Sequence, residues 1–281
     1  MPDGAIEIRP LSGSLGAEIH GVDLSERLGA EAFGAIERAF LDHLVVFFRD
    51  QRLGPEDLVA FARRFGPIGI YPLAEPLEGH PEVIAVVKEP EQATNFGGCW
   101  HSDTAYLETP PAATALYARE VPALGGDTLF ANMYLAYERL SAGMKRLLDD
   151  LVAVNSADKN KDFLRGDHLL GGSMAGTARE AAGFSAEHPV VRRHPRTGRK
   201  ALYVNRAHTV CFRGMSVAES APLLDYLFEH AVREERTCRF HWQSGSLALW
   251  DNRCTQHYPL NDYHGYRRVM HRVTIAGQRP A

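Results

Sequence analysis

Residues 247–276 read LALWDNRCTQHYPLNDYHGYRRVMHRVTIA, and they contain two strands on which the assignment of fold class depends. Segments 247–250 and 266–276 combine apolar, aromatic and β-branched side chains, a composition typical of strands. Elsewhere we expect strands within 6–19 and at 44–48, 83–87, 113–117, 128–130, 190–194, 201–204 and 237–242, and helices at 30–43, 55–65, 133–140, 143–151 and 217–233. Because strands and helices do not alternate regularly, the pattern disfavours a doubly wound parallel sheet and predicts a mainly β fold with flanking helices.

The chain of 281 residues contains no linker, internal repeat or low-complexity segment. With 45% hydrophobic and 23% charged residues it has the composition of a soluble globular protein that buries a substantial core. We therefore expect residues 1–281 to form one domain. Residues 156–187 are rich in glycine and lack periodicity, so they are predicted to form a loop that covers a pocket.

Charge and cysteine content narrow the class of partner. The formal net charge of −4 provides no basic field for a phosphate backbone, so nucleic acid is not an expected partner. The four cysteines lack CxxC spacing, the N-terminus lacks the pattern of a signal peptide, and no apolar run is long enough to span a membrane. We expect a cytoplasmic protein with reduced thiols and no membrane association.

The tetrapeptide Trp100-His101-Ser102-Asp103 is the first candidate for chemistry. If this segment is a strand, the imidazole of His101 and the carboxylate of Asp103 lie on the same face. A third ligand from elsewhere would complete the 2-His-1-carboxylate set of non-haem Fe(II) oxygenases, which leaves coordination positions open. A lone His-x-Asp pair is, however, more often a hydrogen-bonded structural pair than part of a metal site.

The C-terminal region contains the residues that would complete such a site. His257 is the candidate third ligand. In an extended segment Arg268 and Arg272 share one face with Met270, while His271 lies on the other. Two guanidinium groups on one face repel each other unless anions lie between them, and guanidinium is well suited to a bidentate grip on carboxylate or sulfonate groups.

With these residues in place, the chain resembles the Fe(II)/2-oxoglutarate-dependent dioxygenases, in the branch of taurine, alkylsulfate and aryloxyalkanoate dioxygenases. The resemblance covers almost the whole chain. It is carried by FGPIGIYPLAEP at 65–76, WHSDTAYLETPPA at 100–112, GGDTLFANMYLAYERLS at 125–141, RKALYVN at 199–205, LWDNRCTQHYPLNDY from 249 and RRVMHRVTIAG ending at 277. The resemblance implies a double-stranded β-helix, or cupin-like jelly roll, with helices on its outside.

The resemblance also implies roles for individual residues. His101, Asp103 and His257 would bind Fe(II). Arg268, helped by the hydroxyl of Thr128, would hold the distal carboxylate of the cosubstrate 2-oxoglutarate. O₂ would be the second cosubstrate, and succinate and CO₂ would be products. Arg272 would approach the anionic group of the substrate, and Trp250 would form part of the pocket wall near the iron.

The substrate is less well determined by the sequence. Taurine dioxygenases of this family use a histidine after the FG turn and an asparagine four residues before the first iron ligand; the segment here is Gly66-Pro67-Ile68-Gly69-Ile70-Tyr71, and the second position is Gly97, although Asn95 lies nearby. We expect an anionic small molecule less polar than taurine: a sulfonate, a sulfate ester, an aryloxyalkanoate or another carboxylate. Further substrate contacts are predicted at Phe163, in the covering loop, and at Tyr71 and Asn205, either of which could instead satisfy buried backbone groups.

Two alternatives stay open at this point. A His-Asp-His set could hold zinc in a hydrolase, and the chain could be a non-catalytic ligand-binding jelly roll. Hydrolysis does not require a carboxylate clamp of the kind predicted at Arg268 and Thr128. Relatives in the resembling family are commonly dimers or tetramers, so a homodimer or homotetramer is possible.

Overall fold

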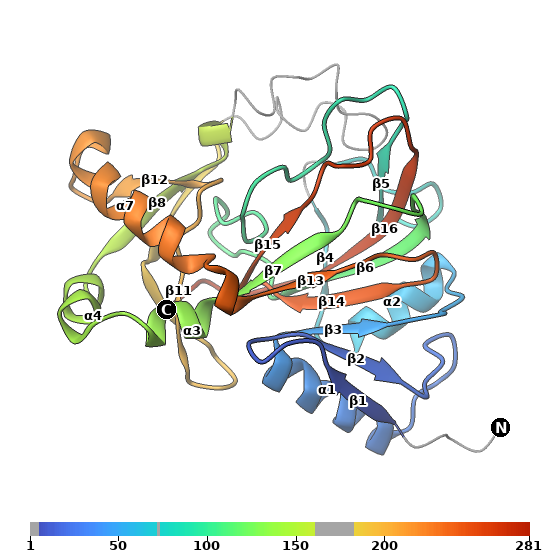
Figure 1. The fold of residues 1–281 in the computed structure, drawn as a ribbon. Coiled ribbons are helices and arrows are strands. Elements are labelled where there is room, and N and C mark those ends of the chain that lie inside the picture. The colour runs from blue at the N-terminus through green and yellow to red at the C-terminus, as the bar shows by residue number, and fades with distance from the viewer. Residues whose placement is uncertain (1–5, 72–73, 161–182) are drawn as a thin grey trace.

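The computed structural model of the chain describes residues 6–71, 74–160 and 183–281 (Figure 1). The strands in these ranges are β1 (Glu7–Pro10), β2 (Ala17–His20), β3 (Val45–Phe48), β4 (Ile68–Gly69), β5 (Val83–Lys88), β6 (Ala113–Glu120), β7 (Thr128–Asn132), β8 (Val152–Ser156), β9 (Ser185–Pro189), β10 (Val191–Arg193), β11 (Lys200–Leu202), β12 (Thr209–Phe212), β13 (Thr237–Phe240), β14 (Leu247–Asp251), β15 (Thr255–Pro259) and β16 (Arg268–Ile275). The helices are α1 (Ala30–His43), α2 (Pro55–Arg63), α3 (Met133–Glu138), α4 (Ala142–Leu148) and α7 (Val217–Ala231), with short 3-10 turns at Ala157–Asn160 and Glu234–Arg236.

The largest sheet has eight strands in the order β1-β2-β3-β14-β6-β16-β4, with β5 also paired to β16. Every pair in it is antiparallel except β2 with β3. A second, antiparallel sheet contains β13-β7-β15, and two smaller sheets contain β12-β8-β9 and β10-β11. Strands from both ends of the chain therefore lie side by side, as β14 does between β3 and β6.

Successive side chains on the strands of the large sheet point to opposite faces, and they contribute to two separate apolar layers. On β14, Leu249 joins the cluster that contains Ile36 of α1 and Phe61 of α2, so these helices cover the outer face of the sheet. Trp250, one residue later, joins the inner cluster together with Phe130 of β7 in the second sheet. The two sheets thus bury a common core, and even-numbered side chains of β16 point toward it.

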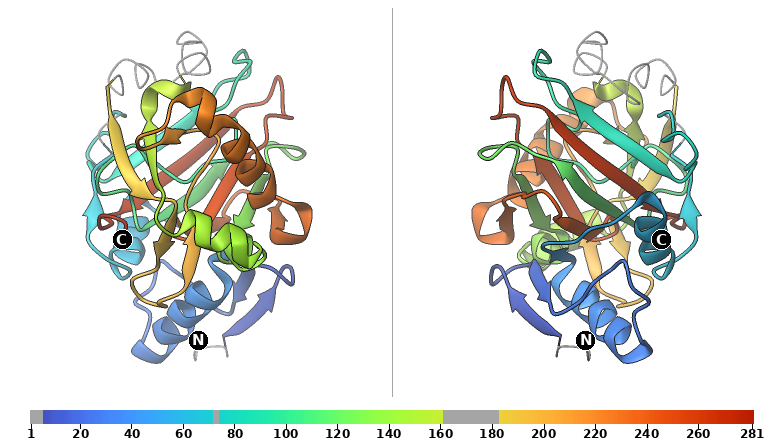
Figure 2. Two further views of the ribbon diagram at one scale, coloured as in Figure 1. Left: turned by 90° about the vertical axis from the view of Figure 1, so that its left-hand side faces the viewer. Right: turned by 90° about the vertical axis from the view of Figure 1, so that its right-hand side faces the viewer.

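The helices begin where the sequence provides caps. The hydroxyl of Ser216 accepts a hydrogen bond from the backbone N–H of Glu219, and Glu219 reaches back to Ser216, which gives α7 a capping box. Pro55 occupies the first turn of α2, where its missing N–H costs nothing. Helices α3, α4 and α7 gather at one end of the molecule, beside β8, β11 and β12 (Figure 2).

Most predicted elements are confirmed, with two corrections. Residues 156–187 are not all loop, because Ala157–Asn160 form a 3-10 turn and β9 begins at Ser185 and pairs with β8. The segment around His101 is not a strand: His101 forms an isolated bridge, and Asp103 lies in the turn that follows. Phe163 lies outside the described residues. Within the described ranges, no helix is long and apolar enough to cross a membrane.

Candidate metal centre

Two histidines far apart in the sequence are joined through their backbones. The N–H of His101 donates to the carbonyl of His257 at 3.1 Å, and the N–H of His257 donates to the carbonyl of His101 at 2.8 Å. Because this antiparallel bridge fixes both Cα atoms, the imidazole centroids lie 4.1 Å apart. The bridge therefore places two ring nitrogens on one side of the backbone, facing the core between the sheets.

The carboxylate of Asp103 completes the group. Its Oδ1 lies 3.9 Å from Nε2 of His101 and 3.8 Å from Nε2 of His257. All three side chains are buried, and their candidate ligand atoms lie within 4.8 Å of one another. Although Asp103 lies in a turn and not in the predicted strand, its carboxylate is still next to the imidazole of His101.

Hydrogen bonding leaves the inward-facing nitrogen of His101 available. Its Nδ1 lies 2.7 Å from the carbonyl of Cys99, so Nδ1 carries the proton and Nε2 presents a lone pair. Burial lowers the pKa of both His101 and His257, which keeps the imidazoles neutral. Burial alone would raise the pKa of Asp103, but the charge of Arg272 and the hydrogen bond from Thr114 act in the opposite direction, and the pKa lies below its ordinary value.

The donor set fits a divalent metal ion. Two bonds of about 2.1 Å from an ion to its nitrogen or oxygen ligands span up to roughly 4.2 Å, which exceeds the separations of Oδ1 from both Nε2 atoms. Two neutral imidazoles and one carboxylate are the ligands of the facial triad, and the set leaves room for exogenous ligands.

A second buried group of suitable residue types does not fit a metal. In the group of His194, Asp251 and Cys254, Nδ1 of His194 accepts hydrogen bonds from the backbone N–H groups of Arg196 and Thr197, so its proton sits on Nε2 and points to Asp251 at 3.0 Å. Asp251 also accepts three hydrogen bonds from Arg253, one from its backbone N–H and two from its guanidinium. Both potential ligands are thus committed to protein partners, and the group is structural.

Arg268 lines the cavity that is also lined by His101 and His257. The side chain is 7% exposed, and its Nε and Nη2 have no hydrogen-bond partner among the described residues. Thr128 lines the cavity beside it, and its hydroxyl accepts a hydrogen bond from the indole of Trp242, which leaves the hydroxyl proton for another acceptor. A buried unpaired guanidinium is costly, so this end of the cavity is suited to a carboxylate ligand.

Lys88 is a second buried cation that the sequence did not reveal. It lies directly opposite Arg268 in the pairing of β5 with β16, so both side chains are on the inner face. Its ammonium group lacks a hydrogen-bond partner in the described structure and sits 4.3 Å from the ring centroid of Tyr263. Burial lowers the pKa of Lys88. The only signal in the sequence was a lysine ending an apolar strand.

Arg272 follows Arg268 on the same face of β16 and contacts the candidate metal ligand Asp103. Its Nη2 lies 3.0 Å from Oδ2 of Asp103, and its guanidinium carbon lies 5.1 Å from the ring centroid of Tyr71. Its Nε has no hydrogen-bond partner among the described residues, so donor capacity remains for an anion. The prediction that Arg268 and Arg272 share a face is confirmed, since both side chains line the same cavity.

The rest of the cavity is apolar and aromatic. It is lined by Val86, Phe96, His101, Leu116, Thr128, Trp250, His257, Pro259, Arg268 and Arg272. Val86 and Phe96 also pack against a small cluster that contains Tyr71 and Tyr106, which extends the apolar wall beyond Arg272. The ring of Trp250 lies 4.7 Å from that of His257, in agreement with its predicted place near the ligands.

Three other positions clarify the predicted substrate contacts. The side chain of Asn205 accepts a hydrogen bond from the backbone N–H of His208, which favours the backbone-satisfying alternative. Asn95 donates to the carbonyls of Pro259 and Leu260 and is thereby fixed in a structural role. His208 was not singled out from the sequence. It is buried, its ring centroid lies 5.0 Å from that of Tyr106, and burial lowers its pKa to about 3.

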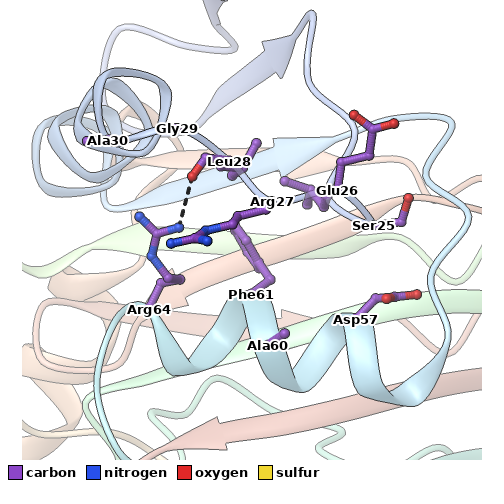
Figure 3. Close-up of a pocket in the computed structure, with 11 residues that line it drawn as sticks. Ser25, Glu26, Arg27, Leu28, Gly29, Ala30, Asp57, Ala60, Phe61 and Arg64 are labelled. Carbon is purple, nitrogen blue, oxygen red and sulfur yellow. Dashed lines mark hydrogen bonds between the residues drawn. The ribbon is translucent and has the colours of Figure 1, made fainter.

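A larger surface cleft lies on the opposite side of the large sheet, between residues 24–30 and α2 (Figure 3). There Arg64 donates to the carbonyl of Leu28 at 3.3 Å, and Phe61 forms part of the wall. The cleft has no predicted site residue in its lining, and α2 and the sheet separate it from the candidate metal ligands.

Comparisons with characterised proteins agree with this geometry. Residues 7–274 match the family described as "Taurine catabolism dioxygenase TauD, TfdA family". An "Alpha-ketoglutarate-dependent sulfate ester dioxygenase" of Pseudomonas putida is 36% identical over 282 residues, covering 98% of this chain and 91% of that protein. A "(S)-phenoxypropionate/alpha-ketoglutarate-dioxygenase" of Sphingobium herbicidovorans is 31% identical, with coverage of 97% and 96%.

Two solved structures are also similar. A taurine dioxygenase from Burkholderia xenovorans superposes with a TM-score of 0.83 at 35% identity, covering 99% of this chain and 91% of the other. The structure of AAD-2 in complex with Mn(II) and N-oxalylglycine gives a TM-score of 0.80 at 31% identity and covers 99% of both chains.

Proposed function

Because the chain belongs to the TauD/TfdA family of dioxygenases, we propose that it is an Fe(II)- and 2-oxoglutarate-dependent dioxygenase that oxidises an anionic small organic substrate. The observation that carries the proposal is the sharing of one cavity by His101, His257, Arg268 and Arg272, with the carboxylate of Asp103 beside them. The donor set could bind a metal ion, and each of the two arginines could bind one anionic group.

His101, Asp103 and His257 would hold the ferrous ion. When bound, the iron supplies the site at which O₂ is reduced as 2-oxoglutarate is decarboxylated to succinate and CO₂. The protein's own contribution is to keep both imidazoles neutral and Asp103 ionised, so that all three groups are ready to bind a cation. The similar structure of AAD-2 in complex with Mn(II) supports the assignment.

Arg268 and Thr128 would bind the distal carboxylate of 2-oxoglutarate. The guanidinium offers two donors without partners in the described structure, and the threonine hydroxyl offers a third. Lys88 lies opposite Arg268 on the same face and adds to the positive potential there. A carboxylate at this place would remove the cost of leaving Arg268 buried and unpaired.

Arg272 would bind the anionic group of the substrate, and the aromatic wall would hold the remainder. Tyr71, Tyr106 and Phe96 offer apolar surface near the guanidinium, and the position at which taurine dioxygenases of the family have an asparagine is Gly97 in this chain. This favours a sulfate ester, a sulfonate with a larger apolar body, or an aryloxyalkanoate over taurine. Curated relatives named for sulfate ester and phenoxypropionate substrates support the same classes.

The architecture supports the domain assignment. We propose that residues 1–281 form one catalytic domain with a double-stranded β-helix core, since the two facing sheets bury a common cluster and the candidate ligands lie between them. We further propose a cytoplasmic protein, since the family's cosubstrate 2-oxoglutarate is available there.

A succinate-release assay across sulfate esters, sulfonates and phenoxy acids tests the proposal. We expect O₂-dependent succinate formation that rises when an alkylsulfate or phenoxy acid is added and rises little with taurine. Ester cleavage under strict anaerobiosis and without 2-oxoglutarate would instead indicate the zinc hydrolase. Failure of the Fe(II)-loaded chain to bind 2-oxoglutarate in calorimetry would indicate a non-catalytic jelly roll.

A further inference from the structure

A chain of buried hydrogen bonds leads from Trp250 to the ligand Asp103. The indole N–H of Trp250 donates to Oδ1 of Asn252 at 2.9 Å, and Nδ2 of Asn252 donates to the hydroxyl of Thr114 at 2.9 Å. The hydroxyl of Thr114 in turn donates to Oδ2 of Asp103 at 2.7 Å. Thr114 is fully buried and Asn252 is 1% exposed, so bulk water does not compete with these bonds.

The direction of every bond in this chain is determined by chemistry. An indole N–H only donates, so the oxygen of the Asn252 amide must face Trp250 and its NH₂ group must face Thr114. The hydroxyl of Thr114 therefore accepts from Asn252 and has its single proton left for Asp103. Strand pairing fixes the geometry, because Trp250 of β14 lies directly opposite Thr114 of β6.

The two oxygens of Asp103 are thereby distinguished. Oδ1 faces the two imidazole nitrogens, whereas Oδ2 is held by Thr114 and by the guanidinium of Arg272. A carboxylate restrained in this way presents one oxygen to a metal, which leaves the remaining positions for exogenous ligands.

We propose that Thr114, oriented by Asn252, is a positioning residue that keeps Asp103 a one-oxygen ligand of the metal. The inference rests on the proposed function, because it takes His101, Asp103 and His257 as metal ligands. Thr114 is needed in addition to Arg272, since Arg272 has a second task. Arg272 would also bind the substrate anion, whereas the single hydroxyl proton of Thr114 is given to Oδ2 of Asp103.

The test measures Mn(II) binding by the loss of the free-ion EPR signal, without turnover. Thr114→Val keeps the shape and removes the hydroxyl, and we expect it to raise the Kd for Mn(II) by about 10- to 100-fold, the effect typical of lost partners of metal ligands. Thr114→Ser retains the hydroxyl and is expected to bind Mn(II) close to the wild-type value. A purely structural role would not distinguish these variants by their hydroxyl.

Two controls make the outcomes distinct. Thermal unfolding of the metal-free proteins reports whether each variant folds. If Thr114→Val does not fold, Thr114→Ser and Thr114→Ala decide, because they differ by the hydroxyl alone. Wild-type protein that binds no Mn(II) would overturn the proposed function. Wild-type protein that binds Mn(II), with equal affinity in the valine or alanine variant, would overturn the role of Thr114 and leave the proposed function intact.

Discussion

His101 and His257 exchange two backbone hydrogen bonds, at N···O distances of 3.1 and 2.8 Å, and so the two candidate imidazole ligands are fixed to each other. No residue intervenes between the two backbones. A change that displaces one imidazole is therefore expected to disturb the other, and the site is expected to lose metal as a unit.

Gly97 tests the sensitivity of this arrangement. A Cβ atom at Gly97 would lie 2.8 Å from Cε1 of His101, closer than real contacts allow. We expect Gly97→Ala to weaken Mn(II) binding by about 10-fold or more, since the imidazole has to move. The matched control is Gly79→Ala: Gly79 also has a positive φ, but nothing lies within 4 Å of its Cβ position. Similar metal affinity in both variants would contradict the packing argument.

Arg268→Met is expected to raise the KM for 2-oxoglutarate by roughly 10- to 100-fold, because hydrogen bonds to charged groups contribute about 1.5–3 kcal/mol. Steady-state assays at varied cosubstrate concentration provide the measurement. The neighbouring Arg267 points outward and pairs with Glu89 and Glu120 on the surface, so Arg267→Met is the control and should leave the KM unchanged. Equal effects in the two variants would contradict the assignment of Arg268.

Removal and return of metal should change stability as well as activity. Chelation is expected to abolish succinate formation, and Fe(II) should restore it. Mn(II) at 100 times its Kd is expected to raise the free energy of unfolding by about 2.7 kcal/mol through mass action. Denaturant titration of wild type and Asp103→Ala checks this. An equal gain in the variant would place the bound ion elsewhere.

Acid is expected to destabilise the fold through its buried histidines. Burial lowers the pKa of His230 from 6.5, while its Nε2 contacts the carbonyl of Ala136 at 2.8 Å. The unfolded chain then binds the proton more readily, so the free energy of unfolding falls as the pH drops below about 6.5, by at most about 1.4 kcal/mol per pH unit for one histidine. His230→Gln should reduce this slope in metal-free protein, and the exposed His264→Gln should not. An unchanged slope in His230→Gln would be the contrary result.

The sequence predicted most helices and strands, and it indicated candidate ligands, because these signals are local. His-x-Asp and the arginines of β16 are readable from spacing and residue chemistry, and the amphipathic helices from apolar periodicity. Strand β15, with the sequence TQHYP, was missed because its buried residues are mainly polar and show no alternation. In β9 only Ala186 and His188 are buried, which is too weak an apolar pattern to distinguish a strand from a loop.

The contacts that tune the site could not be read from spacing, because they cross between strands. Asn252 reaches Thr114 because β14, which it follows, pairs with β6, and Lys88 faces inward because of its register against Arg268. The backbone bridge between His101 and His257 is likewise a product of tertiary structure. Sequence reasoning named the candidate residues, and the fold determines which of their atoms face one another.

The central claim is that His101, Asp103 and His257 hold a ferrous ion to which 2-oxoglutarate binds. The most direct measurement is an anaerobic titration of the Fe(II)-loaded protein with 2-oxoglutarate, followed through the weak visible charge-transfer band. We predict that the band appears in the wild type and is lost in His257→Ala while Arg267→Met retains it. Absence of the band in folded, Fe(II)-loaded wild-type protein, or its persistence in His257→Ala, would contradict the account.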